Sequence, residues 1–166
     1  MIRGLVGRHA KLRFPRRLWR ELVVELGRRG EGSRESGAFL LTPRGSDGRT
    51  ITRVVYFDDL DPSCLTGGVT LAGAAFPRLW DLCDQHQIRV AGDVHTHPGD
   101  WVAQSPTDHD NPMVARAGHL ALIIPRLAQQ PVRARHVGVH EYLGDEGWSC
   151  AHGRAAARSL YIGWWA

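Results

Sequence analysis

The spacing of hydrophobic side chains along the chain separates helices from strands. Residues 15–29 predict an amphipathic helix, because apolar residues recur there at helical intervals: Leu18, Trp19, Leu22, Val23 and Leu26. Pro15 suits the first position of this helix, and Gly30 suits its end. The pattern predicts two further helices, over residues 73–87 and 105–116, each of which contains a proline that limits its extent.

Short apolar runs between these helices predict buried strands. The runs lie at residues 36–42, 50–57, 88–95, 119–125, 135–143 and around Trp148. The first two flank the turn sequence PRGSDG and therefore predict a hairpin. Residues 69–71 form a further short candidate strand. Because helices are mixed with buried strands, we expect an α/β or α+β domain in which helices cover a sheet.

The length of the chain, 166 residues, suits one domain. It falls below the roughly 200 residues that an eight-stranded α/β barrel needs. We assign residues 15–150 to the domain, residues 1–14 to an N-terminal extension and residues 151–166 to a C-terminal tail, which forms either a small helix or a loose segment. Trp164 and Trp165 indicate that this tail docks against another surface.

Charge and hydropathy argue against several classes of partner. The net charge is +4, and the arginines are spread along the chain, so we expect no nucleic-acid partner. No apolar run reaches the roughly 18 residues of a membrane span, and the N-terminus lacks the apolar core of a secretory signal. We therefore expect a cytoplasmic protein without membrane contact. The three cysteines are widely spaced, which disfavours a disulfide framework.

The candidate chemistry lies in a cluster of histidines and acids. A period of two along residues 88–97 places His95 and His97 on one face of a strand and the apolar residues on the other: Ile88, Val90, Gly92 and Val94. A loop then leads to Ser105, and a helix that starts there has Asp108 in its first turn, facing the histidines. Two imidazoles, one carboxylate and a fourth position for water are typical of catalytic zinc.

Zinc at this point would produce a nucleophile from water near neutral pH, and a carboxylate base would complete the reaction. Ser105 is placed to donate a hydrogen bond to a developing oxyanion. These groups predict a metallopeptidase or an amidohydrolase. The segment from Ser105 to Asp108 is also a helix N-cap pattern, but a cap explains neither His95 nor the spacing to His97.

The segment resembles the JAMM motif of catalytically active JAB/MPN domains. That motif is His-x-His, seven residues, Ser, two residues and Asp; the chain has His95-Thr96-His97, seven residues from Pro98 to Gln104, then Ser105 and Asp108. Residues 35–40, ESGAFL, are similar to the family's Glu-Thr-Gly-Gly-x-Leu strand start. The resemblance covers residues 15–145. It implies a JAB/MPN-like, cytidine-deaminase-like fold, in which helices flank a curved mixed β-sheet.

The resemblance also implies roles for individual residues. His95, His97 and Asp108 would bind one zinc ion, Glu35 would be the general base, and Ser105 would help to hold the tetrahedral intermediate. The family cleaves peptide or isopeptide bonds after the C-terminal glycine of ubiquitin or ubiquitin-like proteins. The length and arginine-rich composition look more like its bacterial members, some of which belong to antiviral operons, and some relatives need a partner protein for activity.

Several alternatives remain open at this stage. A sulfur-carrier peptidase in cysteine or cofactor biosynthesis would use the same site, and a non-catalytic MPN scaffold would lack bound metal. Ala38 and Thr42 replace glycines that are usual in the family, and Glu31 is the nearest rival to Glu35 as base. Asp93 shares the histidine face and is either a residue that orients a ligand or a surface acid. Trp101 either lines a substrate channel or packs the loop. We expect three further polar residues to be solvated loop groups: Asp100, His109 and Asp110.

Overall fold

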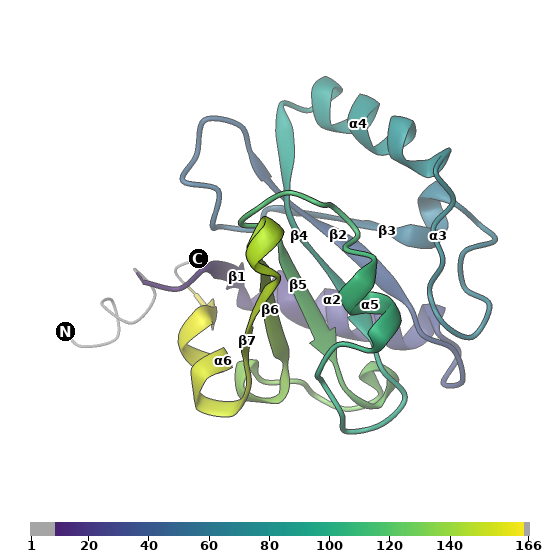
Figure 1. Cartoon of the computed structure of the whole chain (residues 1–166), viewed down its shortest axis with the longest axis vertical. Helices are drawn as coiled ribbons and strands as arrows, with labels where there is room; N and C mark the ends of the chain where they lie inside the picture. The colour runs from purple at the N-terminus through teal and green to yellow at the C-terminus, as the bar shows by residue number, and fades with distance from the viewer. Residues whose placement is uncertain (1–8, 165–166) are drawn as a thin grey trace.

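The computed structural model describes residues 9–164. Within them, six strands form one sheet in the order β3-β2-β4-β5-β6-β7 (Figure 1). The strands are β2 (Gly37–Pro43), β3 (Arg53–Tyr56), β4 (Ile88–Thr96), β5 (Leu120–Ile124), β6 (Gly138–Tyr142) and β7 (Trp148–Ala151). Strands β4 and β5 are parallel, and the other neighbouring strands are antiparallel. The sheet is open and mixed, flanked by helices, as the sequence predicts.

The helices and turns of the described residues surround this sheet. They are α2 (Arg16–Arg29), α3 (Phe57–Leu60), α4 (Ala75–Gln85), α5 (Pro106–Asp110), α6 (Gly153–Ser159) and the 3-10 turns η1 (Arg126–Ala128), η2 (Ala134–His136) and η3 (Gly144–Glu146). Pro15 immediately precedes α2 instead of occupying its first turn, and Gly30 ends the helix as predicted. Among residues 9–164, no helix combines the length and the apolar character needed to cross a membrane.

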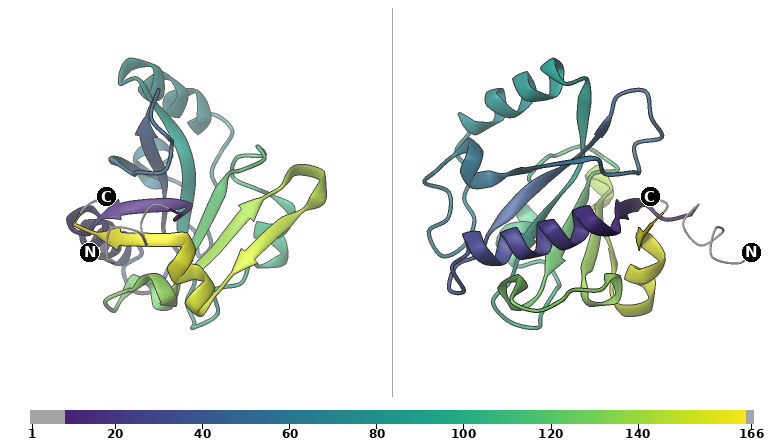
Figure 2. Two further views of the ribbon diagram at one scale, coloured as in Figure 1. Left: turned by 90° about the vertical axis from the view of Figure 1, so that its left-hand side faces the viewer. Right: turned by 180° about the vertical axis from the view of Figure 1, so that it is seen from behind.

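Two hydrophobic clusters hold the helices on the sheet. Helix α2 buries Leu22 and Leu26 in the larger cluster, together with Val94 of β4. Helix α4 buries Leu79 in the smaller cluster, against Phe39 of β2. Cys64 and Cys83 lie in this smaller cluster as free thiols. Seen from behind, α2 runs across the sheet, away from α4 (Figure 2).

A β-bulge in the central strand corrects the predicted assignment of faces. Leu40 of β2 pairs with Gly92 and Leu41 pairs with Val90, so Ala91 is an extra residue in β4. Val90 therefore belongs to the smaller cluster, while Val94 belongs to the larger one. A strict period of two placed Val90 and Val94 on the same face and was wrong there, because a bulge shifts the alternation by one residue.

Both flanking segments of the chain contribute strands that the sequence does not predict. Strand β1 (Leu12–Pro15) pairs in parallel with β8 (Leu160–Gly163), forming a separate two-stranded sheet. Phe14 and Leu160 join the larger hydrophobic cluster. The tail forms helix α6, the first of the two predicted alternatives, and then β8. The Arg16 guanidinium lies over the Trp164 ring, 5.5 Å from its centroid, whereas Trp165 lies outside the described residues.

One predicted strand is absent from the described residues. Residues 69–71 form no named strand, and the segment contributes only an isolated bridge between Leu65 and Val69. The segment follows two consecutive glycines at residues 67–68, and glycine weakens strand formation. The predicted hairpin of β2 and β3 is confirmed by their antiparallel pairing.

Candidate metal centre

Strand pairing brings two distant segments of the sequence to one end of the sheet. Strands β2 and β4 are antiparallel, so the start of β2 lies beside the end of β4. The Thr96 amide donates to the Ser36 carbonyl over 2.9 Å, and the Ser36 amide donates to Thr96 Oγ1 over 3.0 Å. Glu35 precedes this pair and His97 follows it, so both side chains belong to the same end of the sheet.

Three side chains converge at this end and offer ligand atoms to a single point. His95 and His97 are 8% and 4% exposed, and their Nε2 atoms lie 3.0 Å apart. Asp108 Oδ2 lies 3.6 Å from His95 Nε2 and 3.4 Å from His97 Nε2. The three ligand atoms fall within 4.8 Å of one another, so this group could hold a metal ion. The structure thus brings together all three predicted ligands.

The loop after β4 orients the His97 ring. His97 Nδ1 lies 3.1 Å from the Trp101 carbonyl oxygen and donates its hydrogen to it. The hydrogen on Nδ1 leaves the Nε2 lone pair directed at the cluster, which is the tautomer that a metal ligand needs. The Trp101 ring stacks on the His97 ring with centroids 5.3 Å apart and is 55% exposed. Trp101 therefore both covers a candidate ligand and faces solvent.

A second buried histidine holds the same loop against the sheet. His140 on β6 is fully buried, and its Nε2 donates to the Val102 carbonyl oxygen over 2.9 Å. Burial lowers the pKa of His140, and the bond to the Val102 carbonyl only partly opposes that shift. Gly138 permits the approach, since a Cβ there would lie 2.0 Å from the same oxygen. The sequence analysis missed His140, because no local motif links it to the loop.

A left-handed turn fixes the backbone of the loop from the other side. Three successive non-glycine residues, Arg126, Leu127 and Ala128, have φ of 55°, 50° and 57°. This backbone region costs roughly 1 kcal/mol or more per residue, so surrounding contacts must impose it. The Leu127 amide donates to the His97 carbonyl over 2.8 Å, and the Arg126 amide donates to the Gly99 carbonyl over 2.9 Å. The strained turn is therefore hydrogen-bonded to the loop of residues 97–105 between β4 and α5, here called the ligand loop.

Asp108 is held by the cap of its own helix. The amide and hydroxyl of Ser105 both donate to Asp108 Oδ2, over 2.9 and 2.6 Å, and the Asp108 amide donates to Ser105 Oγ over 3.1 Å. Asp108 therefore takes part in the cap of helix α5 and also belongs to the candidate ligand group. Burial raises the pKa of the Asp108 carboxyl, but the neighbouring imidazoles of His95 and His97 and the hydrogen bond from Ser105 outweigh it and hold that pKa well below its usual value.

Glu35 faces the same cluster from the start of β2. Its amide donates to the Gly67 carbonyl over 2.9 Å. Burial raises the pKa of its carboxyl, and the nearby imidazoles of His97 and His95 oppose that rise. A cavity of about 250 Å³ is lined by Glu35, His97, Pro98, Gly99, Trp101, Ser105 and Asp108. The rival acid, Glu31, is 71% exposed at its side chain and pairs with Arg34, outside this lining.

The donor set of the cluster fits a divalent metal. Without a cation, two imidazole nitrogens and a carboxylate oxygen would face one another within 3.6 Å in a largely buried position. His97 already has its other ring nitrogen committed to a carbonyl, which leaves one nitrogen for a ligand bond. Two imidazoles and one carboxylate match the ligand type of catalytic zinc.

Asp93 lies next to this site but has a partner of its own. It is 3% exposed and lies 2.5 Å from Nε2 of the fully buried His119. The surface-acid alternative is wrong, because Asp93 pairs with Phe39 of β2 and is buried inside the domain. Its hydrogen-bonded partner is His119 instead of either histidine of the cluster. The predicted solvated groups are exposed: the His109 ring lies 3.0 Å from the Asp110 carboxylate, and Asp100 forms an ion pair with Arg126.

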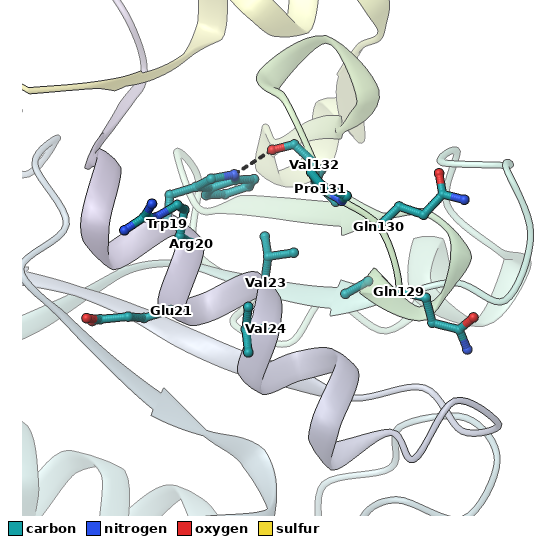
Figure 3. Close-up of a pocket in the computed structure, with 10 residues that line it drawn as sticks. Trp19, Arg20, Glu21, Val23, Val24, Gln129, Gln130, Pro131 and Val132 are labelled. Atoms are coloured by element: carbon teal, nitrogen blue, oxygen red, sulfur yellow. Dashed lines mark hydrogen bonds between the residues drawn. The ribbon is translucent and has the colours of Figure 1, made fainter.

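The larger cavity of the described residues lies elsewhere. A groove of about 630 Å³ runs between α2 and residues 128–132, where the Trp19 indole donates to the Val132 carbonyl over 2.7 Å (Figure 3). Its walls are mostly apolar, and its one acid, Glu21, pairs with Arg17 on the helix surface. The groove carries no candidate catalytic group, so the chemistry is assigned to the smaller cavity.

Comparison with known proteins places the fold. No family model matches the sequence. The chain is similar to the solution structure of a Desulfitobacterium hafniense protein, with a TM-score of 0.61, 18% identity and coverage of 91% of this chain and 92% of that one. For the solution structure of a Salinibacter ruber protein the TM-score is 0.56 and the sequence identity 16%, with coverage of 84% of this chain and 88% of that one. For the crystal structure of a JAB1/MPN domain protein from Archaeoglobus fulgidus the TM-score is 0.41 and the sequence identity 13%, with coverage of 91% of this chain and 96% of that one. The first two likenesses concern the fold alone.

Proposed function

We propose that the chain is a zinc-dependent peptidase or isopeptidase that cleaves after the C-terminal glycine of a ubiquitin-like protein. One observation carries the proposal: His97 and Asp108, which form the ligand group together with His95, line one cavity with Glu35. The same four residues match the JAMM pattern in the sequence. Glu35 lies 60 positions before His95, so their meeting depends on the strand pairing and not on local spacing.

Each ligand residue has a defined part in this proposal. His95, His97 and Asp108 would hold the ion, and zinc there would supply a Lewis acid that polarises a carbonyl and activates water near neutral pH. The Trp101 carbonyl keeps His97 in the correct tautomer. Ser105 keeps the carboxylate of Asp108 directed at the imidazoles.

Glu35 suits the transfer of a proton. Its carboxyl is half-buried, and burial raises its pKa, so it holds a proton more readily than a solvated glutamate. A carboxylate of this kind can take a proton from the attacking water and deliver it to the leaving amine. The Ser105 hydroxyl donates to Asp108 in this structure, so it serves a developing oxyanion only after it turns toward the substrate.

The dimensions of the cavity support a substrate with a narrow tail. Its volume is about 250 Å³, and Trp101 and Pro98 form part of its wall. An extended chain that ends in glycine has no side chain to clash with the Trp101 ring. Such tails also add readily to sheet edges through main-chain hydrogen bonds. The proposed substrate class is therefore a protein with an extended, glycine-terminated tail.

The test is cleavage of a panel of fusions, followed by intact mass. Each fusion joins a ubiquitin-like or sulfur-carrier protein, through its C-terminal glycine, to a short reporter. We expect the zinc-loaded chain to cut directly after the glycine and a chelator to stop the reaction. Glu35→Gln should retain zinc and lose turnover by roughly 100-fold or more, as is usual for a general base. The matched control is Glu31→Gln, an exposed acid outside the cavity.

The outcomes separate the alternatives. Full turnover by Glu35→Gln would contradict the assigned base, and chelator-resistant cleavage would contradict the metal. Cleavage confined to the sulfur-carrier fusions would move the substrate class to the sulfur-carrier peptidase. A zinc-loaded chain that cuts no member of the panel would contradict the proposed substrate class, and a chain that binds no zinc would favour the scaffold.

A further inference from the structure

We propose that the chain binds a phosphate group of a small molecule in a polar cavity at the start of β4. The cavity has a volume of about 280 Å³, and its charged lining residues come from several separate segments: Lys11, Asp47, Arg49, Arg89, Arg116 and Glu141. Arg89 is six residues before His95 on the same strand, which is about 20 Å of extended chain. The inference therefore stands apart from the proposed peptidase site.

The charges of the cavity wall do not cancel. Its two acids are already engaged: Asp47 pairs with Arg13, and Glu141 pairs with Lys11. Across residues 9–164, the Arg89 and Arg116 side chains form no ion pair with a carboxylate, although both line the cavity. Positive charge that is concentrated in a recess attracts an anion more strongly than the same charge on an open surface.

Arg89 provides the observation that points directly to a missing acceptor. Its Nε is buried and has no hydrogen-bond partner in the described part of the chain. Its Nη2 lies against the turn at Gly48, where φ is 75° and an added Cβ would come within 2.1 Å of that nitrogen. A buried donor without an acceptor is destabilising, so an arginine held in this position calls for an oxygen ligand.

Arg116 brings a second guanidinium to the same stretch of β4. Its Nη2 donates to the carbonyl of Val90, the residue after Arg89, over 2.9 Å. An acceptor shared by the two guanidinium groups would offset their mutual repulsion. A phosphate dianion suits that position better than a carboxylate, because its several charged oxygens can accept from two guanidinium forks together. The geometry therefore favours a phosphate-bearing ligand.

The test uses the full chain and two simple probes, inorganic phosphate and pyrophosphate, titrated calorimetrically at constant ionic strength. We expect saturable binding with one site per chain. Arg89→Gln and Arg116→Gln should each weaken it by roughly tenfold or more, the size expected for a lost charged hydrogen bond. The matched control is Arg20→Gln, an exposed arginine on α2 that lines the other groove. Its affinity for both probes should equal that of the wild type.

A second readout guards against misfolded variants. Phosphate should raise the unfolding temperature of the wild type and of Arg20→Gln, and should leave that of Arg89→Gln unchanged. Arg89→Lys keeps the charge and loses the fork, so it should bind with intermediate affinity. Equal weakening by Arg20→Gln, equal binding of acetate, or absence of saturable binding would overturn the proposal. Much tighter binding of a single-stranded oligonucleotide than of pyrophosphate would overturn it in favour of a nucleic-acid surface.

Discussion

Gly37 and His95 are direct partners across β2 and β4. A side chain at Gly37 would not fit, because its Cβ would lie 2.3 Å from the Phe57 ring and 2.7 Å from the Val94 carbonyl oxygen. The pairing has a chemical consequence at the end of both strands. It brings Glu35, two residues before the glycine, into the cavity that His97 lines. The pairing register of β2 and β4 thus positions both Glu35 and the candidate metal ligands His95 and His97.

Zinc should stabilise the folded chain. A ligand that binds only the native state adds about 2.7 kcal/mol to the free energy of unfolding at a concentration 100-fold above its Kd. We expect metal-free protein to show this gain in urea denaturation on addition of zinc, with one ion per chain by elemental analysis. His97→Ala should lose most of the gain.

The control for the zinc experiment is His109→Ala, which removes an exposed imidazole that pairs with Asp110. It should keep both the stoichiometry and the gain in stability. Equal stabilisation of the two variants by zinc would contradict the assigned ligand group.

Glu35→Gln should stabilise the metal-free protein at about pH 7. Burial raises the pKa of Glu35 above its ordinary value. A carboxyl with a raised pKa stabilises the fold while it is protonated, and this contribution is lost as the pH rises through the folded-state pKa. Near neutral pH the buried wild-type carboxylate therefore destabilises the fold, and the uncharged glutamine removes this effect. Urea denaturation of both proteins at several pH values measures the difference.

The size of this effect depends on pH. Below about pH 4, Glu35 is protonated in both the folded and unfolded states, and the two proteins should converge in stability. Glu31→Gln, at an exposed position, should track the wild type throughout. A Glu35→Gln protein less stable than the wild type near neutral pH would show that the carboxylate is not strained by burial.

Gly138→Ala should loosen the ligand loop. The added methyl group would meet the Val102 carbonyl oxygen at 2.0 Å and His140 Nε2 at 2.7 Å, so the loop must move. We expect a loss of about 1–3 kcal/mol in the free energy of unfolding, the usual cost of overpacking. Zinc affinity in a chelator competition should fall as well, since Trp101 precedes Val102 and holds His97.

Gly73→Ala is the matched control for Gly138→Ala, because its Cβ would meet no atom within 4 Å. It should change neither stability nor zinc affinity. If Gly138→Ala lost stability and kept full zinc affinity, the loop anchor would be structural and not a positioning device for His97.

Asp93→Ala should destabilise the fold and leave the metal group intact. It removes the hydrogen-bond partner of the fully buried His119, and leaving a buried polar group unpaired costs about 1–3 kcal/mol. The exposed Asp110→Ala should change stability by no more than about 0.5 kcal/mol. Thermal unfolding and zinc stoichiometry measure both effects. Loss of zinc from a folded Asp93→Ala protein would instead make Asp93 an orienting group for the ligands.

Sequence reasoning succeeded where the determinants are local. The spacing from His95 to Asp108 spans a strand end, a loop and a helix cap, each with its own residue signature, and the structure brings these ligands together. The helix of residues 15–29 was predicted to within one residue, because its apolar stripe and Gly30 are both local signals. The β2–β3 hairpin followed from its turn.

The remaining features depend on contacts between distant segments. The bulge at Ala91 follows from pairing with β2, and no residue of β4 marks it in advance. The pairing of β1 with β8 joins segments at opposite ends of the described chain. His140 reaches the loop across the sheet, and the left-handed backbone at Leu127 occurs without a glycine. Periodicity carries no information on such long-range matches.

The Asp108 oxygen that completes the capping box of helix α5 also lies beside both imidazoles of the cluster. Asp108 Oδ2 accepts from the amide and the hydroxyl of Ser105 and lies 3.4 Å from His97 Nε2. Whatever occupies the cluster must therefore compete with, or reinforce, the first turn of that helix. The amide protons of Ser105 and Asp108 become natural reporters of occupancy: their hydrogen-exchange rates should follow metal loading without any substrate, label or enzymatic assay.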